Sequence, residues 1–161
     1  MIARGAASVI LAGALILGTS GCNFFVAPST QIPYDASDGV GATVGDIMVR
    51  NVLALSADGE TASLLVTIVN TGNRGQTVNL QYESDGQKRT ITEFVNGGAA
   101  QSFGNVDEDQ LVLSGLDAVV GGILPIFVQY GQKTGKTILV PVLDGSLTEY
   151  ADLLPVQTET K

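Results

Sequence analysis

From Val44 onward the sequence predicts a single all-β sandwich of about seven or eight strands, on three observations. Short runs rich in β-branched and aromatic residues recur as far as Leu143. Clusters of Gly, Asn, Asp and Ser separate the runs roughly every 8 to 12 residues, a spacing typical of sandwiches and barrels. Within the runs apolar and polar residues alternate, as in strands that bury one face.

The sequence pattern in the first half of this domain predicts two β-hairpins. A first run keeps its apolar residues at one parity, and a turn at 57–60 joins it to a second alternating run, so the two pair as a hairpin. After a break at 70–75, a third run alternates, turns at 84–87 and returns over 91–95. The alternating apolar residues are Ile47, Val49, Leu53, Leu55, Leu64, Val66, Ile68, Val78, Leu80 and Tyr82.

The second half predicts strands over 100–103, 110–113, 123–130 and 137–143, which gives a domain spanning 44–143. About 100 residues are enough for one ordinary hydrophobic core. The tail over 144–161 is expected to dock a short helix on the sandwich. Ser146 and Glu149 have the spacing of a capping box, and Pro155 ends the run.

The N-terminus has the form of a secretory signal. Arg4 supplies a positive charge, and an uncharged apolar run follows from Gly5 to Leu17. That run is about 13 residues long, shorter than the roughly 20 that a membrane-spanning helix needs, which favours a cleaved signal over a transmembrane anchor. The predicted signal peptide covers 1–21.

The only cysteine of the chain stands directly after this signal. The segment Leu17-Gly18-Thr19-Ser20-Gly21-Cys22 resembles the bacterial lipobox. The resemblance implies that Cys22 carries a lipid anchor of diacylglycerol and palmitate on the extracytoplasmic face of the cell membrane. Residues 22–43 are expected to be this lipidated cysteine and a flexible tether. The alternative is an ordinary cleaved signal followed by an unmodified thiol.

Composition excludes several classes of function. The chain has no histidine, which removes Ser-His-Asp and Cys-His nucleophiles and imidazole metal ligands. One cysteine allows no internal disulfide and no CxxC site. With 16 acidic against 8 basic residues and a net charge of −8, the chain is not expected to bind nucleic acid. We therefore expect no catalytic residue, no cofactor and no metal site.

Three short motifs each have a simpler structural interpretation than the site that they resemble. The segment 131–137 lacks the glycine spacing of a phosphate loop and is interpreted as a hairpin turn with solvated lysines. The segment 39–45 misses the GxGxxG spacing and is interpreted as a flexible hinge. Asp107, Glu108 and Asp109, with Asn105, are the densest source of oxygen ligands or acid–base groups. They lack the spacing of an EF-hand, and an acidic loop is usually only solvated.

Over about 100 residues the chain resembles actinobacterial lipoproteins related to the PCu(A)C periplasmic copper-chaperone domain. The segments that carry the resemblance are Val66–Gly72, Gln110–Leu116 and Thr137–Val142. It implies a Greek-key β-sandwich, cupredoxin-like or immunoglobulin-like in kind. In the family, a His-x-Met pair opens the segment that ends in Gly-Leu.

Aligning on Gly115-Leu116 places Gln110 at the histidine of that pair and Val112 at the methionine, and neither suits cuprous copper, which selects sulfur and imidazole. After signal cleavage Met48 is the one methionine left. The sequence therefore predicts a non-catalytic, lipid-anchored accessory module with a protein partner in the cell envelope. One alternative is a copper-binding, metallochaperone-like protein with atypical ligands, and a second is a carboxylate-dependent hydrolase.

Overall fold

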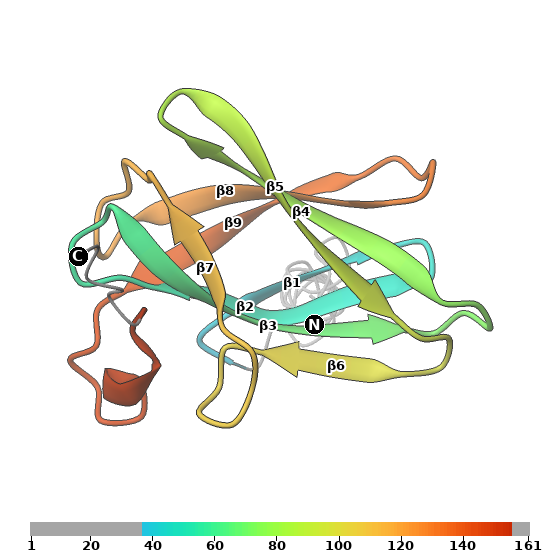
Figure 1. Ribbon diagram of the computed structural model, residues 1–161, viewed down its shortest axis with the longest axis horizontal. Helices are drawn as coiled ribbons and strands as arrows, with labels where there is room; N and C mark the ends of the chain where they lie inside the picture. The colour runs from blue at the N-terminus through green and yellow to red at the C-terminus, as the bar shows by residue number, and fades with distance from the viewer. Residues whose placement is uncertain (1–36, 156–161) are drawn as a thin grey trace, which may run out of the picture. The chain divides into compact units, whose positions relative to one another are not determined.

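The computed structural model describes residues 37–155, and they form an all-β sandwich, as the sequence predicts (Figure 1). The predicted signal peptide, Cys22 and most of the tether lie outside the described residues. No helix between residues 37 and 155 is long and apolar enough to cross a bilayer. The described elements are β1 (Val40–Val44), β2 (Ile47–Leu55), β3 (Thr61–Asn70), β4 (Gln76–Ser84), β5 (Gln87–Val95), β6 (Ala100–Phe103), β7 (Leu111–Ser114), β8 (Ile123–Tyr130), β9 (Lys136–Leu143) and the 3₁₀ helix η2 (Ala151–Leu153).

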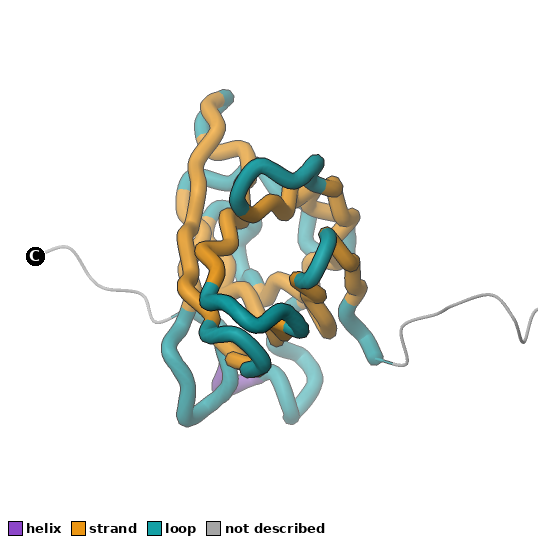
Figure 2. The backbone as a smooth tube through the Cα atoms, turned by 90° about the vertical axis from the view of Figure 1, so that its right-hand side faces the viewer, coloured by secondary structure: helices purple, strands orange, loops and turns teal. Residues whose placement is uncertain are grey.

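The strands run in the order β5-β4-β8-β9-β2-β3-β6, with β1 also paired to β2 and β7 to β3. All pairings are antiparallel except the short one between β2 and β9, where Ala54 faces Val142 and Leu55 faces Leu143. This parallel contact joins the two sheets. Figure 2, turned by 90°, shows the strands wrapping round the core. Strands far apart in sequence are neighbours, as Greek-key connections require.

The strand β1 replaces the flexible hinge expected at 39–45, and it brings the number of strands to nine in the described residues. It pairs with β2 from Val40 opposite Val52 to Val44 opposite Ile47. The residues of β1, Val-Gly-Ala-Thr-Val, are mostly small and alternate only weakly between apolar and polar. The sequence pattern therefore does not predict a strand here. Gly39 suits its place because a Cβ there would lie 2.5 Å from the carbonyl carbon of Asn51.

A β-bulge at Asn51 overturns the predicted parity of β2. Asn51 has a φ of +49°, and the register with β3 shifts between Arg50 and Leu53. The extra residue rotates the second half of the strand, since a shift of one residue exchanges the two faces. Leu53 therefore leaves the main core that holds Ile47.

The structure thus has one large core and one small one. The small core lies on the opposite face of β2 and β3, where the C-terminal tail covers it. Its buried members are Leu53, Leu55, Leu65 and Leu153. The large core is formed by the inward side chains of all the strands, among them Ile47, Val49, Leu64, Val66, Ile68, Val78, Leu80, Ile126, Val128, Val140 and Val142.

The capping box predicted at Ser146 does not form. The Ser146 hydroxyl and backbone N–H both donate to the Asp144 carboxylate, at 2.5 and 3.1 Å. The helical turn η2 begins five residues later and has no side-chain cap. Because Asp144 competes for the serine, the Ser-x-x-Glu spacing marks a turn here rather than a helix start.

Candidate binding site

Gln110 and Val112, at the positions where the resemblance places copper ligands, lie just before and within β7. The Gln110 side-chain amide donates to the carbonyl oxygens of Leu153 and Leu154, at 3.3 and 3.1 Å. It thereby ties the C-terminal tail to β7. Val112 is 40% exposed on the outer face of β7, between the buried Leu111 and Leu113.

Met48 lies away from these two positions. It stands opposite Val69 on β3, whereas β7 pairs with β3 over Thr61–Leu64. At about 3.3 Å per residue, five residues of strand separate the two places by roughly 16 Å. In the described part of the chain, no three His, Cys, Asp or Glu side chains form a group fit to hold a metal ion.

The acidic loop between β6 and β7 is solvated. Asp107, Glu108 and Asp109 are all exposed. The Glu108 carboxylate accepts a 2.6 Å hydrogen bond from the side-chain amide of Asn105, so two of the four candidate oxygen ligands bond each other. The hydrolase alternative instead needs two carboxylates that converge in a cleft.

A different feature stands out in the sheet of β5, β4, β8 and β9, where β4 and β8 separate. Their pairing runs from Val78 opposite Tyr130 to Gln81 opposite Phe127 and ends there. Yet β4 continues to Ser84 and β8 begins at Ile123. Figure 1 shows the tip of the β4–β5 hairpin diverging from the start of β8.

Pro125 gives the chemical reason for this separation. Two residues before Phe127, it holds the register position that would face Glu83. Proline has no backbone N–H, so it cannot donate to the next rung of the ladder. The pairing therefore stops at the preceding rung.

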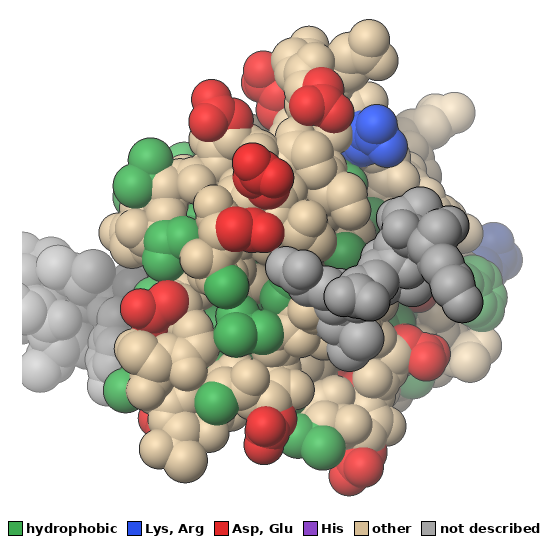
Figure 3. Space-filling model, turned by 60° about the vertical axis from the view of Figure 1, so that its left-hand side comes forward, with side chains coloured by type: hydrophobic (Ala, Val, Ile, Leu, Met, Phe, Trp, Pro, Cys, Tyr) green, Lys and Arg blue, Asp and Glu red, His purple; other side chains and the backbone are tan. Residues whose placement is uncertain are grey.

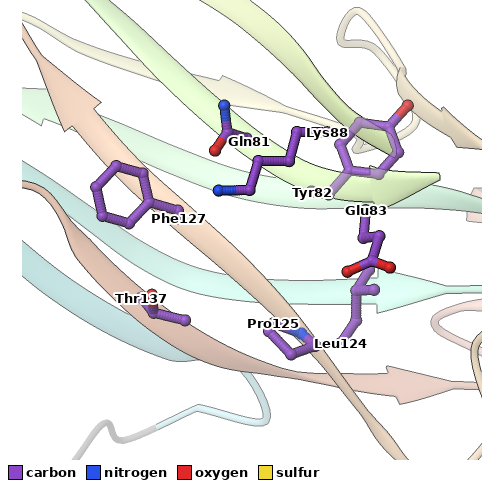
Figure 4. A pocket seen from close by; sticks show the side chains of 8 residues that line it. All are labelled: Gln81, Tyr82, Glu83, Lys88, Leu124, Pro125, Phe127 and Thr137. Carbon is purple, nitrogen blue, oxygen red and sulfur yellow. The ribbon is translucent and has the colours of Figure 1, made fainter. Parts of the chain in front are cut away.

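A first cavity of about 300 Å³ occupies the opening. Figure 4 shows the Lys88 ammonium extending towards Phe127, while the Glu83 side chain lies on the side of Leu124 and Pro125. Tyr82 and Leu124 belong to the core and are each 7% exposed. The cavity is lined by Gln81, Tyr82, Glu83, Lys88, Leu124, Pro125, Phe127 and Thr137.

A second cavity of about 700 Å³ shares Glu83, Leu124 and Pro125 with the first. It adds the carboxylates of Asp85 and Asp117 and the apolar side chains of the loop that leads into β8. The backbone N–H of Asp85 donates to the carbonyl oxygen of Gly115, at 2.9 Å, which fixes the hairpin tip on this loop. We call the two cavities together the β4–β8 groove.

Apolar side chains continue from the groove over the outer face of β8 and β9. Ile123 is 61% exposed and Leu139 57%. The register sets Ile123 beside Pro141 and Pro125 beside Leu139, so the exposed residues form one stripe. Figure 3 shows another aspect of the surface, on which acidic side chains surround hydrophobic ones and basic ones are few.

Sequence reasoning missed this groove, although one signal was visible. The run Ile123–Val128 is apolar at both parities, whereas a strand with one solvated face alternates. Such a run indicates a strand whose two faces are both covered. What the sequence does not show is that β4 stops pairing beside it.

Comparisons with known proteins identify the fold alone. No family model matches the chain, and no curated protein matches it. Among solved structures, it is similar to an "apo PmoF2 PCuAC domain" with a TM-score of 0.52 and 13% identity, covering 67% of this chain and 98% of that one. A "Copper-bound PCuAC domain from PmoF2" matches with a TM-score of 0.42 and 15% identity, over 65% and 98% of the two chains. The chain therefore shares the β-sandwich fold of a PCuAC domain.

Proposed function

We propose that the protein is a lipid-anchored accessory module on the extracytoplasmic face of the cell membrane, that it has no catalytic role, and that it binds another envelope protein. The signal-like N-terminus and the lipobox-like segment ending in Cys22 support the anchor. Two or more acyl chains hold a protein stably on a bilayer, where a single one does not.

The observation that carries the binding role is the β4–β8 groove. Here the core residues Tyr82 and Leu124 line a cavity that opens between two strands of the sheet. The apolar stripe of β8 and β9 adjoins it. Contiguous exposed apolar surface on a soluble domain marks a place of interaction. The absence of histidine from the chain and the exposed acidic loop favour binding over catalysis.

Replacing the cysteine tests the anchor. With Cys22→Ala, we expect the protein to leave the membrane fraction or to remain as an uncleaved precursor. Ser29→Ala, in the predicted tether, is the matched control and should fractionate like the natural chain. Unchanged processing and membrane retention of the Cys22→Ala protein would overturn the anchor.

Site-specific crosslinking tests the binding role. A photoreactive residue at position 139, beside the groove, should give a discrete adduct with an envelope protein in native membranes. The same residue at position 107, in the acidic loop, should give none. Equal crosslinking from both positions would contradict a role for the groove.

The fold likeness to a PCuAC domain favours copper binding by atypical ligands as a second candidate function. Titrating the purified protein with cuprous ion distinguishes the two, because soft ligands are required for tight uptake. We expect no stoichiometric uptake. Tight binding of one equivalent, lost in Met48→Leu, would reverse the order of the two candidates.

A further inference from the structure

We infer that the β4–β8 groove binds an extended segment of a partner protein in which Lys or Arg alternates with apolar residues, and that this segment adds to the sheet as an extra strand. The inference rests on the proposed function, since it names the surface through which the module acts and the chemistry of what it binds.

The first support is the free backbone edge of β4. Asp85 and Gly86 form a two-residue turn with φ values of +51° and +70°, and Ser84 faces Gln87 across it. In such a hairpin the residues flanking the turn bond each other, so the adjacent Glu83 directs its N–H and C=O away from β5. That side is the groove, where the ladder with β8 has already ended at Gln81.

The second support is the matching edge of β8. Its other side pairs with β9 from Ile123 to Val128, so the groove side is the one without a strand partner over Ile123–Ile126. Two strand edges that lack partners thus border one opening. Unpaired edges are the template for strand addition, in which backbone hydrogen bonds supply affinity and side-chain pockets supply specificity.

The third support is the chemistry of the walls. The first cavity offers apolar contacts from Leu124, Pro125 and Phe127, enough for an aliphatic side chain, beside one ammonium group, that of Lys88. The second adds the carboxylates of Asp85 and Asp117 to that of Glu83, which lines both cavities. Alternate side chains of an added strand point to opposite faces, so its apolar residues can meet the inward Tyr82 and Leu124 while its basic residues meet the outward Glu83.

The charge of each possible occupant also determines which one fits the groove. The segment of this chain that precedes the described residues, 23–36, contains no Lys or Arg, so it does not match the carboxylates. A second copy carries the same net charge of −8 and is repelled. A basic segment of a different protein fits the groove best.

Peptide binding to the full chain in detergent micelles tests the inference. The probe is a labelled peptide Val-Lys-Val-Lys-Val-Lys-Val, followed by fluorescence anisotropy. We expect saturable binding that weakens as salt rises. The Glu-for-Lys peptide and a peptide with proline at its central position should bind at least tenfold more weakly. Equal binding of all three would overturn the inference.

Variants of the protein test whether the peptide binds in the β4–β8 groove. Glu83→Gln removes one exposed charge and should raise the Kd about two- to fivefold, whereas Asp107→Asn removes a charge elsewhere and should leave it unchanged. Pro125→Val keeps an apolar wall but restores the missing N–H, so β4 and β8 can pair as far as Glu83. We expect it to weaken binding at least tenfold and to slow amide exchange at Glu83.

Natural affinity in both Glu83→Gln and Pro125→Val would overturn the inference. If Pro125→Val does not fold, Glu83→Gln and Asp117→Asn decide in its place.

A tenfold gain in peptide affinity on deleting 23–36 would mean that the chain's own tether occupies the groove. Self-association that is abolished by Glu83→Gln would mean that a second copy occupies it. Either result overturns a basic partner. Because binding in micelles does not require membrane retention, failure of the anchor is seen separately with Cys22→Ala.

Discussion

The backbone N–H of Asp46 donates a 2.9 Å hydrogen bond to the phenol oxygen of Tyr130, 84 residues further along the chain. Asp46 lies in the turn between β1 and β2, and Tyr130 is the last residue of β8, buried to 3% exposure. A Cβ on Gly45, whose φ is +54°, would lie 2.3 Å from the same oxygen. The contact therefore fixes the β1–β2 turn against the opposite sheet and leaves room there for glycine alone.

Removing the Tyr130 hydroxyl should lower the free energy of unfolding by little more than the contribution of one hydrogen bond. Tyr130→Phe keeps the ring in the core and leaves the N–H of Asp46 at the surface, so we expect the free energy of unfolding to fall by about 1 kcal/mol. Gly45→Ala adds a clash and a strained φ and should cost more. Denaturant unfolding measures both, and an unchanged midpoint in Tyr130→Phe would contradict the bond's contribution.

Asn70 is fully buried and should tolerate substitution poorly. Its side-chain amide donates to the carbonyl oxygens of Arg74 and Val95, at 2.8 and 3.1 Å, and its oxygen accepts from the N–H of Gly72, at 3.0 Å. Asn70→Ala leaves these groups unpaired and should lower the free energy of unfolding by about 3 kcal/mol. The exposed Asn73→Ala is the control, and equal losses in the two variants would refute this role.

The turn between β2 and β3 should weaken in acid. The Asp58 carboxylate accepts hydrogen bonds from the N–H groups of Thr61 and Glu60, at 3.0 and 2.9 Å, and these lower its pKa below 3.8. A lowered pKa gives stability that is present above 3.8 and is lost as the pH falls through the folded-state pKa. Unfolding curves of the natural chain and Asp58→Asn should differ most near neutral pH and converge in strong acid. A constant difference would count against this explanation.

Tyr150 should titrate later than an ordinary tyrosine. Its hydroxyl donates a 2.6 Å hydrogen bond to the Asp38 carboxylate, and this bond, with some burial, raises its pKa to about 12. The stability that follows is present below pH 10 and is lost as the pH rises through 12. Absorbance at alkaline pH should show a late-titrating phenol that is missing in Tyr150→Phe and shifted towards pH 10 in Asp38→Asn. A titration unaffected by Asp38→Asn would refute the cause.

The strand content of the domain was predictable because alternation and turn residues are local signals. The hairpin of 131–137 is one such case, with Val128 facing Lys136 and the lysines exposed. The parity of β2 was not predictable from alternation, because Ile47 and Leu53 are separated by the bulge at Asn51. Asparagine adopts positive φ more readily than most residues, but nothing in the local pattern says that it does so there.

For the site, the sequence alone carries the expectation that Gln110 and Val112 do not hold cuprous copper, because ligand chemistry is a property of the residue type. It did not predict the groove, because that depends on the register between β4 and β8. Pro125 lies in a run whose other residues predict a strand. Its effect on strand pairing can be inferred only once the neighbouring strand is known. Glu83 and Asp117, 34 positions apart, line the same cavity through tertiary structure alone.

The place of β9 in the sheet has a consequence for biogenesis. The last strand of the described residues lies in the middle of the strand order, where it links β8 to β2. Until Leu143 has been synthesised, the strand that pairs with both β8 and β2 is missing, so the core cannot be completed. Closure through such long-range pairing is slow, so we expect the domain to complete its fold only after most of the chain has been made.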